Sequence, residues 1–137
     1  MKIYVKEYVY STGKEYELID ITGDVESAVA KSKVQNGICL VFAPHATAAI
    51  IANEHEKGLI EDIISAIKEH FPRSKNWRHN LIDTNAAAHV ASSFIGADKV
   101  FPVINGRLVR GTWQNIFLVE LDGPRRRRRV IVEVIGD

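Results

Sequence analysis

The first residues of the chain alternate between apolar and polar side chains, which predicts a strand with one buried face. In residues 2–10 the apolar set is Ile3, Val5 and Val9. Apolar runs bounded by turn residues predict further strands over residues 16–21, 38–42 and 48–52.

Three other segments carry apolar residues at helical spacing. The predicted helices cover residues 22–36, 59–71 and 85–94. In the longest of them the leucine, isoleucine and phenylalanine residues form one stripe, and Pro72 stops the helix. The first helix begins with Thr22 or Asp24 as a cap and ends near an Asn-Gly pair.

The last third of the chain is rich in predicted strands. Asn105-Gly106 follows residues 100–104, and this pair supplies the positive φ angles of a type I′ hairpin turn. A second turn at 122–124 separates residues 116–121 from 130–135. Because strands come first and last with helices between them, we expect an α+β fold, with antiparallel β-sheets packed with two to three helices.

Length and composition indicate one globular domain, residues 1–137, with 46% hydrophobic and 26% charged residues. A net charge of +1 gives no field that would attract nucleic acid. The single cysteine, Cys39, excludes an internal disulfide and lies in an apolar run, so we expect a buried thiol. The most apolar stretch, 38–52, is broken by Pro44 and His45 and is shorter than the ~20 residues of a membrane span. We therefore expect a cytoplasmic protein with no membrane partner.

Three of the five histidines lie in segments of unusual composition. His45 and His89 have small neighbours, and His79 lies in a polar, irregular segment. Imidazoles bind divalent metals and move protons near neutral pH, and catalytic zinc commonly has three protein ligands plus water. The three form a candidate metal site in which Asp83 or Asn85 orients a ring. The alternative is three unrelated histidines, one or two of them hydrogen-bonded at loop edges.

Two groups of charged residues are further candidates. Asn53, Glu54 and Asp62 lie near the start of the long predicted helix, and for Asp62 a solvated helix face is the simpler interpretation. Five consecutive arginines, 125–129, lead into the last predicted strand. Arginine binds phosphate bidentately, but the near-neutral chain favours salt bridges within the protein or between subunits, with one arginine on a ligand phosphate.

The segment Arg-Gly-Thr-Trp-Gln-Asn at 110–115 is unusual for a strand. Gly111 allows another backbone or a ligand to approach closely. Thr112, Trp113 and Gln114 then offer a hydroxyl, an aromatic face and an amide to a polar ligand. The alternative is a strand in which the tryptophan belongs to the core.

Together these segments resemble the YjbQ family, in order and over nearly the whole chain. The matching stretches are H-A-T-A-A-I-I-A-N-E at 45–54, Asp at 62, W-R-H-N at 77–80, N-A-A-A-H at 85–89, F-P-V-I-N-G-R-L at 101–108 and G-T-W-Q-N-I-F-L-V-E-L-D-G-P-R at 111–125. One departure is Ala46, where members usually carry threonine or serine. The resemblance implies a YjbQ-like fold of antiparallel sheets on helices, assembled as homotrimers with a cleft near the subunit contacts.

The family has been linked to a secondary thiamine-phosphate synthase activity, so the resemblance implies a metal-assisted enzyme of small phosphorylated metabolites. His45, His79 and His89 are then expected to hold a divalent metal, zinc before magnesium. Asp62 or Glu54 is the expected acid or base. The expected substrate-binding residues are Thr47, Asn53, Asn85, Arg110, Thr112, Trp113, Gln114 and Arg125. A metal-dependent hydrolase and a non-enzymatic trimeric module that binds a metal or metabolite are the alternatives.

Overall fold

The computed structural model describes all residues from 1 to 137. Its strands are β1 (Lys2–Tyr10), β2 (Glu17–Asp20), β3 (Asn36–Phe42), β4 (Ala48–Asn53), β5 (Asp98–Ile104), β6 (Arg107–Leu108), β7 (Asn115–Glu120) and β8 (Arg128–Gly136). Its helices are α1 (Thr22–Ser32), α2 (Lys57–His70), α3 (Ala86–Ile95) and a short 3-10 helix, η1 (Arg78–Leu81). The expected α+β fold is confirmed.

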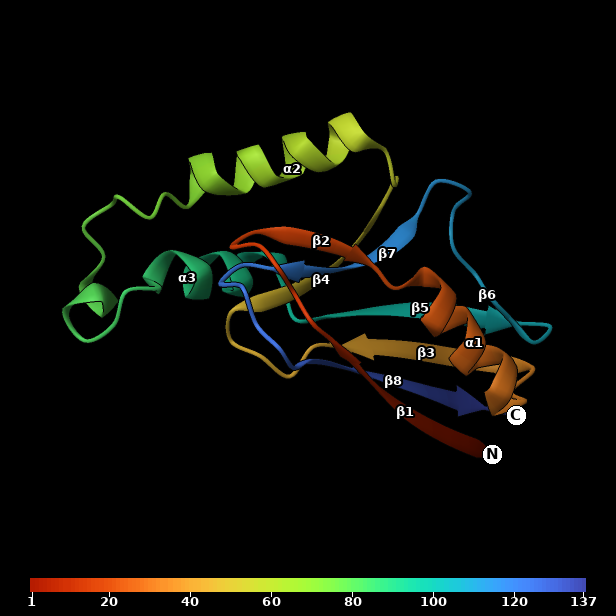
Figure 1. The fold of residues 1–137 in the computed structure, drawn as a ribbon. Helices are drawn as coiled ribbons and strands as arrows, with labels where there is room; N and C mark the ends of the chain where they lie inside the picture. The colour runs from red at the N-terminus through yellow and green to blue at the C-terminus, as the bar shows by residue number, and fades with distance from the viewer.

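Two antiparallel sheets lie against each other (Figure 1). The larger has the strand order β1-β8-β3-β5-β6 and the smaller has the order β2-β7-β4. The main core fills the space between the sheets and α1, because strands of both sheets turn one row of side chains inward. Its largest members include Ile21, Ile50, Ile116 and Leu118.

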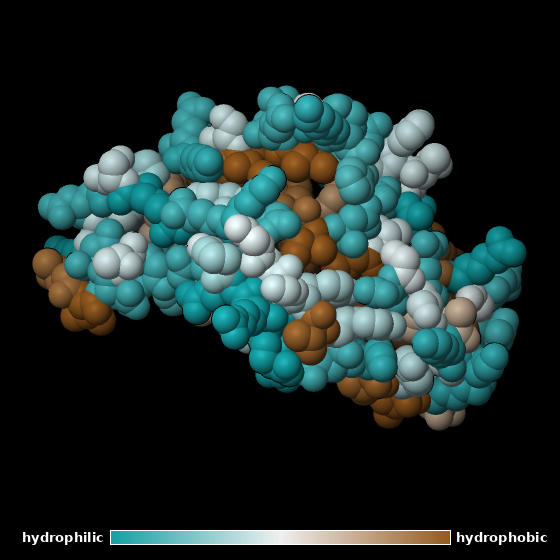
Figure 2. Space-filling model, in the orientation of Figure 1, coloured by the Kyte–Doolittle hydropathy of each residue, from teal (hydrophilic) through white to brown (hydrophobic).

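A second, smaller core lies on the other face of the three-stranded sheet, under α2 and α3. Ile67 packs there with Val119 and Leu121. Ile67 is the only fully buried residue of α2, and the remainder of its apolar stripe is half-buried. Figure 2 shows hydrophobic residues in a hollow beneath this helix. Of the three α-helices, α2 therefore packs most loosely against the rest of the molecule. None of the helices combines the length and hydropathy that a membrane span requires.

The burial of β1 is opposite to the expectation from its pattern. Ile3, Val5 and Val9 face outward, and Ile3 is 66% exposed, whereas the tyrosines at 4, 8 and 10 pack on the core. Tyr10 Oη also donates a hydrogen bond to Asp24 Oδ2 of α1 (2.7 Å). The long aromatic side chains reach α1 from this edge strand, so the tyrosine face is the buried one.

The first helix ends earlier than expected. Lys33, in the left-handed conformation (φ 61°), follows α1 directly, and the Asn-Gly pair belongs to β3. Gly37 is needed there for packing, because a Cβ would lie 1.9 Å from the carbonyl oxygen of Ile135.

Two other local predictions are confirmed. Asn105 and Gly106 both have positive φ in the β5–β6 turn, and Cys39 is fully buried.

Candidate functional site

A buried ion pair organises the end of the molecule where β7 leads into β8. Glu120 is 0% exposed and is bound by Arg128, whose Nε donates to Oε1 (2.9 Å) and whose Nη2 donates to Oε2. Two further hydrogen bonds reach this carboxylate: Thr12 Oγ1 donates to Oε1 (2.7 Å), and the backbone N–H of Asp122 donates to Oε2 (3.0 Å). Arg128 Nη2 also donates to the hydroxyl and carbonyl oxygens of Thr47. We call Glu120, Arg128, Thr12 and Thr47 the Glu120 network.

The network keeps Glu120 ionised. Burial by itself raises the pKa of this carboxyl, but the hydrogen bonds from Arg128 and Thr12 outweigh burial, so its pKa lies below the usual value. Every oxygen of the carboxylate has donors, and the Thr47 hydroxyl accepts from arginine. The network therefore fixes the loop 43–47, which leads into β4. Thr47 was expected to contact substrate, but its hydroxyl and carbonyl oxygens already accept hydrogen bonds from Arg128.

His45 lies at this corner with one ring nitrogen already bonded. Its Nε2 accepts a hydrogen bond from the backbone N–H of Arg129 (2.8 Å), which assigns the ring proton to Nδ1. Burial lowers the pKa of His45, and repulsion by Arg128 lowers it further, so the ring is neutral at pH 7. In this arrangement neither nitrogen of His45 offers a free lone pair to a metal.

The other two predicted histidines do lie together. The rings of His79, in η1, and His89, in α3, have centroids 4.8 Å apart at an angle of 68°. His79 Nε2 is buried without a hydrogen-bond partner. Asn85 Oδ1, one helical turn before His89, is also buried without a partner. Such atoms are uncommon in folded proteins, and a water, ion or ligand usually satisfies them.

Asp122 connects this pair of histidines to the arginine run. Its Oδ2 accepts hydrogen bonds from Asn85 Nδ2 and Arg125 Nη2, each at 2.9 Å, and Arg73 lies 3.6 Å from its Oδ1. Arg125 is about half exposed, so its guanidinium is accessible while Asp122 orients it. The arginine run forms the expected salt bridges within the protein, to Asp122, Glu120 and Glu7.

No three His, Cys, Asp or Glu side chains of one chain are grouped so that they could hold a metal ion. The structure thus brings together two of the three predicted ligands, with His45 held by the Arg129 amide. The three-histidine metal site stays a prediction that a single chain does not complete.

The remaining predicted residues lie at the opposite end of the molecule. Loop 109–114 is held by two hydrogen bonds to Gln114, from the Gly111 amide (2.7 Å) and from Arg110 Nη1 (2.9 Å). Trp113 is 69% exposed, so it does not belong to the core. Asn53 ends β4 opposite Asn115, and Glu54 follows it. Asp62 is exposed on α2, which fits the simpler interpretation of a solvated helix face.

One polar pair was missed by sequence reasoning. Asp20 Oδ2 lies 2.6 Å from His55 Nδ1, and the His55 ring packs edge-on against Phe117. Asp20 also accepts from Asn115 and from the backbone and hydroxyl of Thr22. Burial raises the pKa of Asp20, but these hydrogen bonds outweigh it and hold the pKa at about 2. Asp20 and His55 lie 35 positions apart, and no local sequence pattern links residues at that separation, so the sequence did not predict this pair.

The fold and the His79–His89 pair define an α+β protein of two antiparallel sheets with a polar site at one end. Comparison with known proteins gives the family. The family described as "UPF0047 protein YjbQ-like" matches residues 6–137, and the chain belongs to it.

Relatives in this family match along almost their whole length. A UPF0047 protein of Methanothermobacter thermautotrophicus is 43% identical over 136 residues, covering 99% of this chain and 94% of that protein. A solved structure from Sulfolobus solfataricus, described as a YbjQ-like protein of unknown function, is 58% identical with a TM-score of 0.98, covering 99% of both chains. A YjbQ/UPF0047 family structure from Clostridium acetobutylicum is 37% identical with a TM-score of 0.90, covering 95% of this chain and 99% of that one.

Proposed function

We propose that this protein is an enzyme that acts on small phosphorylated metabolites, with its site at the His79–His89 pair. The observation that carries the proposal is the presence of two buried, unpartnered polar atoms, His79 Nε2 and Asn85 Oδ1, in one short segment. The Asn85 amide oxygen accepts a hydrogen bond from a ligand, and His79 Nε2 donates or accepts one according to the tautomer of the ring. His89, in contact with His79, is the second group that can take or give a proton.

Arg125 binds the phosphate in this proposal. Its guanidinium is oriented by Asp122, which also binds Asn85, so one carboxylate positions the arginine and the amide together. Because Arg125 Nε and Nη2 already donate to Asp122, a phosphate would bind the remaining N–H groups on Nη1 and Nη2.

The family resemblance supplies a particular reaction. A thiazole phosphate nitrogen attacks a pyrimidine carbon, and pyrophosphate leaves with the electron pair of the broken bond. Such a reaction requires mainly positioning of the two substrates and stabilisation of the leaving pyrophosphate. Arg125 offers that stabilisation. His79 or His89 gives a proton to the leaving pyrophosphate, because the attacking thiazole nitrogen carries no proton to lose.

A divalent metal would neutralise the leaving pyrophosphate, and zinc with its preference for imidazole is the predicted ion. His79 and His89 fit two positions of such a site. The third does not fit in one chain, because His45 donates no free lone pair while it accepts from Arg129. The histidines therefore act as proton-transfer groups in the proposed mechanism.

The proposed enzyme is a homotrimer, and the outer face of the larger sheet supports assembly. Strand register places Val5 beside Glu133, and Glu133 beside Leu40, which pairs with Val100. An adjacent row consists of Ile3, Ile135, Ile38 and Pro102. No helix of the chain covers this face, and hydrophobic residues reach the surface along the lower edge in Figure 2, where β1 lies. Apart from Glu133 these two rows are apolar, and an exposed apolar surface of this kind typically marks a protein interface.

The test is an assay of tag-free protein with the thiazole phosphate and pyrimidine pyrophosphate precursors, measuring pyrophosphate and thiamine phosphate together. His79→Ala, His89→Ala and Arg125→Gln should each lower kcat/KM by about 100-fold or more, the usual scale for an acid–base or phosphate-binding group. Arg127→Gln is the matched control and should change the rate less than about twofold.

The other outcomes separate the competing functions. Phosphate or pyrophosphate released from one substrate alone indicates a hydrolase. Ligand binding without any turnover indicates a binding module and overturns the proposed enzyme. Metal analysis of the same samples tests the metal prediction: one ion per chain, lost in His79→Ala, His89→Ala and His45→Ala, confirms it, and no metal after zinc is supplied contradicts it.

A further inference from the structure

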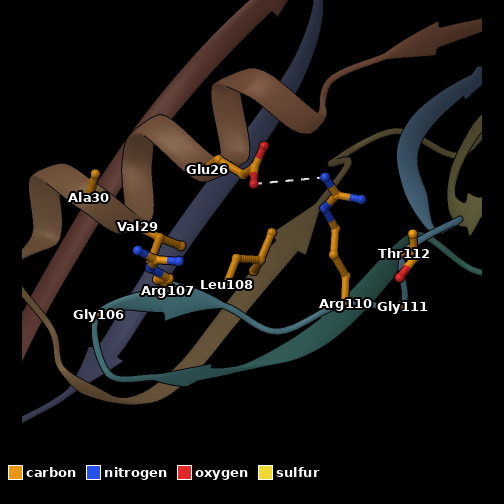
Figure 3. Close-up of a pocket in the computed structure, with 9 residues that line it drawn as sticks. All are labelled: Glu26, Val29, Ala30, Gly106, Arg107, Leu108, Arg110, Gly111 and Thr112. Carbon is orange, nitrogen blue, oxygen red and sulfur yellow. Dashed lines mark ion pairs between the residues drawn. The ribbon is translucent and has the colours of Figure 1, made fainter.

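A groove between α1 and β6 lies at the end of the molecule opposite the histidines (Figures 1 and 3). Its volume is about 620 Å³. This falls within the roughly 300–1,000 Å³ of typical small-molecule sites. One wall is α1, and the other is formed by β6 and loop 109–114. The groove shares no residue with the site proposed above.

Two arginines enter the groove from the β6 side (Figure 3). The Arg110 guanidinium is fixed at one edge, because Nη1 donates to the carbonyl oxygen of Gln114 (2.9 Å). Gln114 is itself fixed by the Gly111 amide. The Arg107 backbone pairs with Ile104, but its guanidinium makes no hydrogen bond or ion pair within the chain. The groove therefore presents one positioned and one uncommitted guanidinium.

Glu26 of α1 is the only acidic residue in the lining. Its Oε2 lies 3.8 Å from Arg110 Nη2, drawn as the dashed line in Figure 3, which is longer than a hydrogen bond. Both side chains are partly exposed, and ion pairs of this kind contribute little to stability. A ligand with two negative charges would bind Arg110 more strongly than Glu26 does and would displace it.

The rest of the lining suits the body of a small organic molecule. Val29 and Leu108 provide apolar contact, and Thr112 adds a hydroxyl that has no partner in the chain. Paired arginine forks recognise phosphate in preference to a single carboxylate. Charge, size and apolar floor together favour a phosphate ester or diphosphate of roughly sugar or single-ring size.

We propose that the α1–β6 groove is a second binding site, for a small phosphorylated ligand, in which Arg107 and Arg110 bind the phosphate and Glu26 is displaced. The choice of ligand class rests on the proposed function, whereas the location is independent of the histidine site. Glu26 then acts as an internal competitor that sets the affinity of the groove.

The test is calorimetric titration with inorganic pyrophosphate at low ionic strength, because salt screens exposed arginines. Arg110→Gln should weaken binding at least about tenfold, and Arg107→Gln about fivefold, since each loses charge-assisted hydrogen bonds. Glu26→Gln should tighten binding about threefold by removing the competitor. Arg127→Gln, an exposed arginine at the other end, is the control and should stay within about twofold.

The Arg125→Gln variant separates this inference from the proposed function. Binding weakened by Arg125→Gln but not by Arg110→Gln places the anion at the histidine site and overturns the second site, leaving the enzyme proposal intact. Binding weakened by Arg110→Gln with full synthase activity supports the groove. Failure of wild-type protein to bind pyrophosphate, or weaker binding by Glu26→Gln, overturns the inference. Amide NMR shifts at Gly106 and Gly111 locate the ligand, and thermal melts show that each variant is folded.

Discussion

Replacing Arg128 with methionine tests whether the Glu120 network holds the β7–β8 end together. Methionine keeps much of the side-chain volume but removes the positive charge and both hydrogen bonds that Arg128 brings to Glu120, which is 0% exposed. Breaking a buried pair from one side typically costs about 3–5 kcal/mol, because the remaining charge is buried without compensation. In a chain of 137 residues this corresponds to a fall in Tm of about 10 °C or more.

The pH dependence of the stability difference between wild type and Arg128→Met is a second, independent test. In the wild type the pKa of Glu120 is depressed, so its contribution is present above the unfolded value of about 4.3 and is lost as pH falls through the folded value. In Arg128→Met only Thr12 and the Asp122 amide still oppose the effect of burial on Glu120. We therefore expect the pKa of Glu120 to rise above the unfolded value, so that stability is lost as pH rises. The difference between the two proteins should therefore be largest at pH 7 and should shrink toward pH 4.

Urea denaturation at pH 7 and pH 4 measures both effects. The double variant Glu120→Leu/Arg128→Met should recover most of the lost free energy of unfolding, because no charge is left buried. Arg127→Met, at an exposed position, is the control and should stay within about 0.5 kcal/mol of wild type. A loss below about 1 kcal/mol for Arg128→Met at pH 7, or an equal loss at both pH values, would show that the ion pair does not hold this end of the molecule together.

Three further predictions concern other parts of the molecule. Asp20→Asn should lower the free energy of unfolding by about 2 kcal/mol at pH 7, since a pKa held at about 2 contributes stability above about pH 4 that is lost as pH falls through 2. Urea melts should show the full deficit at pH 7 and roughly a third of it at pH 2.5. Cys39 should not react with a thiol reagent at pH 8 in the native state, because burial raises its pKa to about 12; rapid labelling without denaturant would contradict this. Val5→Lys should shift the protein toward monomer in size-exclusion chromatography with light scattering, whereas Ser74→Lys, in an exposed loop, should not; an unchanged mass in both would show that the outer sheet face is not the interface.

Several local features could be predicted because their signals lie within a few residues. The apolar stripe predicted a helix over 59–71, and α2 covers Lys57–His70, with Glu56 capping its first amides. The Asn-Gly pair predicted the β5–β6 turn, and both residues have positive φ. Periodicity and turn chemistry act on neighbouring residues, so they survive without knowledge of the fold.

Other features followed from tertiary packing and escaped prediction. The alternation of β1 correctly indicated a strand but favoured the wrong buried face, because the tyrosine row is also apolar enough to be the inner one. Packing against α1 decided in favour of the tyrosines. The helical pattern also predicted that the first helix continues beyond Lys33. Instead the chain forms β3, in which Gly37 pairs with Gly136 of the last strand.

The class of the fold, most of its elements and its family could be inferred from the sequence, because these depend on local periodicity, turns and motif order. Which polar groups meet follows only from the folded chain: His79 contacts His89, His45 accepts from the Arg129 amide, and Asp20 pairs with His55. The last two pairs join residues 84 and 35 positions apart. Such contacts depend on strand register and on which sheet faces are buried together, and those are properties of the whole chain.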